Sequence, residues 1–162
     1  MNFLTTLEQS GFSTWIRESP SVWAYPTILF MHTVGLGFLV GASMVIDLRV
    51  LGFSPQLPLE TMKRFVPVLW FGFWVNALSG LLLVVIDATK MLTNPLFYIK
   101  IGFIALAMIT GRLIANRAFV EQAGGKPVMA PSGKLLAGAS LFFWIAAITA
   151  GRLTAYLFAK AG

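Results

Sequence analysis

The sequence contains no cysteine and very little charge. Of its 162 residues, 57% are hydrophobic and 11% are Asp, Glu, Lys or Arg, whereas a soluble domain carries about 25% charged residues. The absence of cysteine excludes disulfides, thiol nucleophiles and thiolate metal sites. The shortage of charge excludes a water-facing surface over most of the folded chain. We therefore predict an integral membrane protein.

The few charged residues are unevenly distributed along the chain. None occurs in Pro20–Ile46, in Phe65–Ile86 or in Leu135–Gly151. Because about 20 apolar residues are enough to cross the hydrocarbon core of a bilayer, each of these runs predicts a transmembrane helix. A fourth apolar stretch, Pro95–Ala115, contains two basic residues and predicts a fourth crossing.

These runs predict an all-α fold, an integral-membrane four-helix up-down bundle formed by residues 21–162. Residues 1–20 have apolar side chains at helical spacing on either side of Gly11, and charged residues that are incompatible with a signal-peptide core. This N-terminal segment predicts one or two short helices at the membrane surface. The transmembrane helices are predicted at about residues 21–48, 64–88, 95–117 and 133–159.

The twelve Lys and Arg residues, which leave a net charge of +6, are scattered along the chain. This distribution favours contact with anionic lipid over binding of nucleic acid. The positive-inside rule places the more basic side of a membrane protein in the cytoplasm. We therefore predict a multi-pass protein of a bacterial inner membrane with both termini in the periplasm. The more basic side carries Arg49, Lys63, Arg64, Arg112, Arg117, Lys126 and Lys134.

The single histidine, His32, lies inside the first predicted transmembrane helix. At 100° per residue it shares a helix face with Tyr25 and Gly35. Asn76 and Arg152 lie at a similar depth in other helices, roughly 12–18 Å from the outer surface by the helical rise. Polar groups inside a bilayer face the protein interior. The sequence therefore predicts an outer-leaflet polar pocket that contains these residues.

A histidine in a membrane helix, followed by glycines that clear space for a flat ring, is typical of b-type haem sites. In this hypothesis His32 is the axial metal ligand, and Arg152 and Lys100 pair with the haem propionates. Asn76, Tyr25 and Gly35 complete the candidate cofactor site. Because the chain has one histidine, the second ligand would be a methionine or come from another copy, unless the iron is five-coordinate. Copper is the weaker alternative for the metal.

Structural roles also explain these polar residues. His32 can simply form a hydrogen bond with Asn76, Ser43 or Tyr25 and bind no cofactor.

The arginines of the helices likewise have simpler roles than binding a cofactor. Arg152 can extend to the headgroup region or pair with Asp87. Asp47 and Arg49, at the inner end of the first helix, predict an ion-pair cluster with basic residues of the third helix, such as Arg112.

The pattern W-x-Y-P-x5-H-x2-G-x5-G, which runs from Trp23 to Gly41 and continues into VIDLRVLGF, resembles a known family. This is a bacterial family of small four-helix inner-membrane proteins classed as a domain of unknown function. The pattern is more remotely similar to copper-resistance D membrane proteins and to small haem-binding membrane oxidoreductases. That likeness implies a haem or redox role for His32. The chain lacks the further histidines of those haem bundles, so one protomer cannot form a bis-histidine site.

Together these features predict a small cytochrome-like membrane protein. It would transfer electrons between quinone and a periplasmic partner, or anchor such a partner, as an accessory subunit rather than a stand-alone enzyme. One alternative is a non-catalytic scaffold that forms homo-oligomers through glycine-rich helix faces such as Gly37-x-x-x-Gly41. Another is a small transporter or metal-handling protein. One histidine, no cysteine and no phosphate-binding loop argue against hydrolytic and phosphoryl-transfer enzymes.

Overall fold

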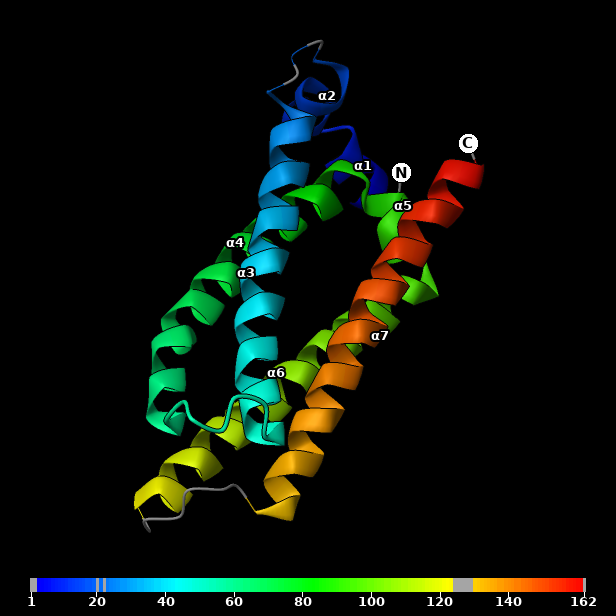
Figure 1. The fold of residues 1–162 in the computed structure, drawn as a ribbon. Helices are drawn as coiled ribbons and strands as arrows, with labels where there is room; N and C mark the ends of the chain where they lie inside the picture. The colour runs from blue at the N-terminus through cyan, green and yellow to red at the C-terminus, as the bar shows by residue number, and fades with distance from the viewer. Residues whose placement is uncertain (1–2, 20, 22, 124–129, 162) are drawn as a thin grey trace.

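The computed structural model describes residues 3–19, 21, 23–123 and 130–161, and every regular element in these ranges is a helix. Four helices are long and apolar enough to cross a membrane. They run alternately in opposite directions (Figure 1), which confirms the all-α class and the four-helix bundle. These helices are α3 (Tyr25–Leu51), α4 (Phe65–Ile86), α6 (Pro95–Ala123) and α7 (Pro131–Ala161).

The bundle is built from two helical hairpins. Helix α3 packs along α4, and α6 packs along α7, while contacts between α3 and α7 join the two pairs. Leu39 and Val40 of α3 meet Ala107 of α6 and Trp144 of α7 in the central apolar cluster. We call the end that carries both chain termini the terminal end, and the opposite end the loop end (Figure 1).

The helix boundaries differ from the predicted ones by a few residues. Helix α3 begins at Tyr25, with Pro26 in the first turn, where a missing N–H breaks no helical hydrogen bond. It extends to Leu51 because Gly52 ends it in a left-handed conformation, with φ of 112°. A 3₁₀ helix, η1 (Leu59–Arg64), leads into α4. Helix α4 ends at residue 86, and the next connection contains a short helix that was not predicted, α5 (Ala88–Leu92).

The N-terminal segment forms two short helices, α1 (Phe3–Glu8) and α2 (Gly11–Glu18), as its spacing predicts. Both pack against the terminal end of the bundle. The Thr89 hydroxyl of α5 donates a hydrogen bond of 2.6 Å to the carboxylate of Glu8. Ile16 of α2 is buried with residues of α3 and α4. The segment therefore closes one end of the bundle.

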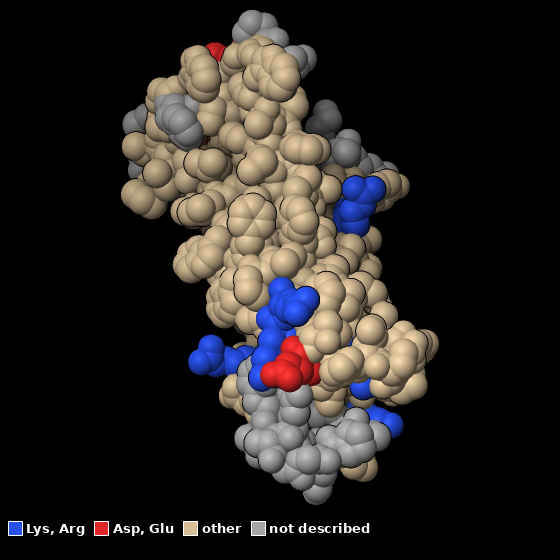
Figure 2. Space-filling model, turned by 60° about the vertical axis from the view of Figure 1, so that its left-hand side comes forward, with Lys and Arg blue, Asp and Glu red and all other residues tan. Residues whose placement is uncertain are grey.

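The outward faces of the long helices carry large apolar side chains. Phe71, Leu78, Ile109, Phe142 and Ile145 are each more than half exposed. Figure 2 shows a broad face almost without charge, with charged side chains gathered toward the loop end. Such a surface is suited to contact with the hydrocarbon of a bilayer.

Candidate functional site

His32 lies between α3 and α4, in the half of α3 nearer the terminal end. Its Nδ1 atom is 3.1 Å from the main-chain oxygen of Asn76 and 3.2 Å from the Ser79 hydroxyl. The Asn76 side-chain amide donates a hydrogen bond of 2.8 Å to the main-chain oxygen of His32. The two residues therefore join the helices reciprocally, and the predicted proximity of His32 to Asn76 is observed.

The partners of Nδ1 determine which tautomer a neutral His32 adopts. A main-chain oxygen can only accept a hydrogen bond, so contact with Asn76 requires Nδ1 to carry the hydrogen. The Ser79 hydroxyl donates to the main-chain oxygen of Val75 at 2.6 Å, which leaves its lone pairs for the imidazole. The Nε2 atom of the neutral ring then keeps its lone pair, as in a metal ligand oriented through its other nitrogen.

Three glycines make the close approach of α3 to α4 possible. A Cβ atom at Gly35 would lie 2.6 Å from the main-chain nitrogen of Asn76, and one at Gly72 would lie 2.4 Å from that of Leu39. Gly35 therefore serves helix packing. We predicted that it clears space for a cofactor ring, but the atoms next to it belong to Val75 and Asn76 of α4. The glycine beside the imidazole is Gly80, where a Cβ atom would lie 2.9 Å from His32 Cε1.

The two predicted propionate partners have different environments. Lys100 of α6 is half-buried, interacts electrostatically with His32, and packs its side chain against Gly151 of α7. Arg152 is exposed and makes no hydrogen bond or ion pair with any described residue. Its face of α7 also carries Tyr156, which is 63% exposed. Lys100 is therefore within electrostatic range of His32, whereas Arg152 faces outward.

Tyr25 is the first residue of α3, and its side chain is within electrostatic reach of Asp87. Tyr25 lies about 10 Å from His32 along the helix axis, as calculated from the rise per residue. Tyr25 therefore belongs to the terminal end of the bundle and not to the contacts that hold the imidazole.

At the loop end, Asp47 does not form the predicted ion-pair cluster. Its side chain is buried, and within the described residues no Lys or Arg lies within ion-pair distance of it. Arg49 instead donates to the main-chain oxygens of Leu57 and Pro55, at 2.6 and 3.1 Å, and so holds the loop after α3. The prediction was wrong because Asp47 faces the interior of the bundle, whereas Arg49 faces the connecting loop.

Sequence reasoning missed the partners of Asp47. The Trp144 indole donates a hydrogen bond of 2.8 Å to the Ser43 hydroxyl, which donates in turn to Asp47 Oδ2 at 3.4 Å. Ser43 and Asp47 share a face because they are four residues apart, which the sequence does show. The contribution of Trp144 from α7 depends on the packing of the two hairpins.

The residues near His32 meet some requirements of a haem site and not others. The orientation of the imidazole and the nearby ammonium of Lys100 fit an axial ligand and a propionate partner. Among the described residues, no three His, Cys, Asp or Glu side chains come together. Copper(II) prefers several such ligands, so the described residues give no support to a copper site at His32.

Comparison of the chain with protein-family models, with curated proteins and with solved structures gives no match in any of the three.

Proposed function

We propose that this chain is a small haem-binding membrane protein that takes part in electron transfer, with His32 as an axial ligand. The observation that supports this function is the contact of His32 Nδ1 with the main-chain oxygen of Asn76. It leaves Nε2 available for a metal and fixes the direction of the ring. A polar group held in this way inside a membrane helix is an unusual feature, and such groups are commonly functional.

The surrounding residues would have distinct roles. Asn76 and Ser79 orient the imidazole, and Gly80 leaves the space in which the ring lies. Lys100 supplies a positive charge for a propionate, and Arg152 is no longer part of the proposed site. Haem, when bound, supplies reversible one-electron chemistry.

The absorption spectrum of the freshly solubilised protein tests the proposal. We expect a Soret band that is lost in His32→Ala and retained in the neighbouring control Thr33→Ala, whose hydroxyl bonds only within α3. Lys100→Met should shift the reduction potential or lower the haem content, whereas Arg152→Met should change neither. A colourless protein without iron, expressed with an adequate haem supply, would contradict the function.

We further propose that the chain lies in a bacterial inner membrane with both termini in the periplasm. The excess of basic residues near the loop end supports this orientation. One of the residues counted there, Lys126, lies outside the described residues. A C-terminal alkaline phosphatase fusion should be active and a fluorescent protein fusion dark, and the reverse pattern would exclude this topology.

A second candidate function is a homo-oligomeric scaffold. It is favoured by Gly37 and Gly41, which are exposed on α3 and would have no atom within 4 Å of an added Cβ. Such a surface permits close approach of another helix. Cross-linking in native lipid should yield defined oligomers that Gly41→Leu abolishes, and a monomer under these conditions would exclude the scaffold.

A further inference from the structure

A cavity of about 230 Å³ lies at the loop end, some 22 Å along α3 from His32 by the helical rise. It is bounded by α3, by η1 with α4, and by α6, and Trp144 of α7 lines its inner wall. Most of its lining is apolar, with Trp70 as a second indole beside Trp144. The volume is several times the approximately 30 Å³ that one water molecule takes up in the liquid. The cavity is therefore large enough for a small organic group.

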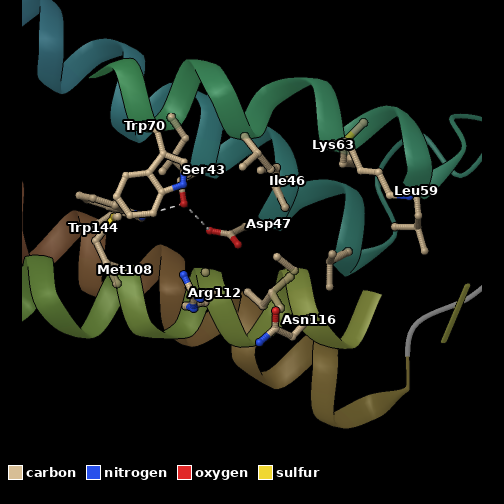
Figure 3. A pocket seen from close by; sticks show the side chains of 18 residues that line it. Ser43, Ile46, Asp47, Leu59, Lys63, Trp70, Met108, Arg112, Asn116 and Trp144 are labelled. Atoms are coloured by element: carbon tan, nitrogen blue, oxygen red, sulfur yellow. Dashed lines mark hydrogen bonds between the residues drawn. The ribbon is translucent and has the colours of Figure 1, made fainter. Parts of the chain in front are cut away.

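One carboxylate faces this apolar cavity. In Figure 3, Asp47 points from α3 into the space between α3 and α6. Its side chain is 1% exposed, and its Oδ2 atom accepts only the long hydrogen bond from Ser43. The acceptor capacity of this carboxylate is thus largely unused within the protein.

Two buried side-chain oxygens in the described residues have no hydrogen-bond partner, and both belong to this region. They are Asp47 Oδ1 and Ser140 Oγ, the latter on α7 and fully buried. The Ser140 hydroxyl lies beside the Asp47 carboxylate, outside strict hydrogen-bond geometry, and only Asp47 of the two lines the cavity. Buried polar atoms are normally paired because desolvation without a partner is costly. Ser140 carries a hydroxyl donor of its own, so the acceptor left without a donor at hydrogen-bond geometry is Asp47 Oδ1.

The charged side chains at the mouth of the cavity are positive, whereas the group inside it is the carboxylate of Asp47. Lys63 and Arg112 line the outer part, with the amide of Asn116. Lys63 forms an ion pair with Glu60 at 3.4 Å. Arg112 is exposed and makes no ion pair or hydrogen bond with a described residue. The cavity thus has a negative group at depth, apolar and aromatic walls, and positive groups at its opening.

We propose that this cavity binds a primary ammonium group carried on an apolar body, with the carboxylate of Asp47 as its hydrogen-bond acceptor. An ammonium group supplies an N–H donor for Asp47 Oδ1, and its charge compensates the buried carboxylate. The indole rings of Trp70 and Trp144 provide apolar contact and favourable surfaces for a cation.

A primary ammonium of this kind has two sources in a membrane. One is a free amphipathic amine, and the other is the headgroup of an aminophospholipid. The positive groups at the mouth separate the two sources, because Arg112 repels a simple cation but attracts a phosphate. Neutralising Arg112 should therefore have opposite effects on the two ligands.

Calorimetric titration of the full-length protein in dodecyl maltoside, with 2-phenylethylammonium as the probe, tests the proposal. 2-Phenylethanol is the neutral control of the same shape, and dihexanoyl phosphatidylethanolamine tests the lipid source. Asp47→Asn should weaken amine binding about tenfold or more, as expected for loss of a charged hydrogen-bond partner. Asp87→Asn, the same substitution outside the cavity, should leave the affinity unchanged.

Two further variants keep the test informative if Asp47→Asn does not fold. Trp70→Leu removes an indole that lines the cavity and is 40% exposed, so it should preserve the fold and weaken amine binding severalfold through loss of the cation–π contact. Arg112→Gln should tighten binding of 2-phenylethylammonium if the free amine is the ligand, and weaken binding of the phospholipid if the lipid is.

Three results would overturn the proposal. The first is equal affinity for 2-phenylethylammonium and 2-phenylethanol. The second is unchanged amine binding in Asp47→Asn or Trp70→Leu, which would mean that the amine does not occupy this cavity. The third is no binding of either the amine or the phospholipid at millimolar concentration by the folded protein.

Discussion

The contact between α3 and α4 predicts that one glycine cannot be enlarged. An added Cβ at Gly72 would lie 2.4 Å from the main-chain nitrogen of Leu39 and 2.8 Å from the main-chain oxygen of Gly35. The shorter distance is about 1 Å below the 3.4 Å at which ordinary contact begins. Because the clashing atoms are main-chain atoms of the neighbouring helix, a side-chain rotation cannot relieve the overlap. Gly72→Ala must therefore move the helices apart.

The expected loss of stability follows from two opposing effects. Overpacking a tight contact costs about 1–3 kcal/mol, whereas replacing glycine by alanine in a helix gains up to about 1 kcal/mol. Gly37→Ala and Gly138→Ala are matched controls, since neither added Cβ would have an atom within 4 Å. The gain is common to all three variants and cancels, so Gly72→Ala should be about 1–3 kcal/mol less stable than either control.

Reversible unfolding in mixed micelles, by titration with sodium dodecyl sulfate and followed by far-ultraviolet circular dichroism, measures this difference. Gly72→Ala should unfold at a clearly lower fraction of dodecyl sulfate than wild type, and Gly138→Ala at the same fraction or a higher one. If Gly72→Ala and Gly138→Ala unfold together, the close approach of α3 and α4 is not a feature of the folded protein. Destabilisation by Gly37→Ala alone among the controls would instead point to a contact between copies.

Three other substitutions test separate interactions. Asn76→Leu removes the interhelical hydrogen bond to His32 and should cost about 0.6–2 kcal/mol in the same assay; an unchanged midpoint would mean that the bond is not formed. Gly52→Ala forces a side chain into a φ of 112° and should cost about 1–2 kcal/mol, measured as a lower thermal midpoint; equal midpoints would exclude the left-handed helix end. Trp144→Phe removes the indole donor to Ser43 and should cost about 1 kcal/mol; the tryptophan side-chain N–H should exchange slowly with deuterium in wild type, and fast exchange would argue against the bond.

The positions of the long helices could be predicted closely because they follow from the properties of the bilayer as a solvent. A bilayer offers no partner for main-chain polar groups, so a long uncharged run must be helical. The ends were predicted less well. The first helix was predicted to end at about residue 48, but it continues to Leu51, where Gly52 caps it in a left-handed conformation.

The candidate site shows what helical periodicity can and cannot predict. His32 and Asn76 were placed at one depth by counting residues, and their contact agrees with that count. The same count placed Arg152 at this depth but carried no information on its direction around α7. Lys100 of α6 packs against Gly151 of α7 and lies within electrostatic range of the imidazole, which the count along one helix could not show.

The amino-acid sequence by itself determined that this chain forms helices, how many are long enough to cross a membrane, and which face of each carries polar groups. These properties are local, since they depend on residue type and on a repeat of 3.6 residues per turn. Only the tertiary structure decided which polar groups meet. The pairing of His32 with Asn76, and of Ser43 with Trp144, depends on the rotation of each helix about its axis. That rotation is set by the packing of main-chain atoms of one helix against glycines of its neighbour, such as Gly72. The sequence of one helix alone does not specify this packing.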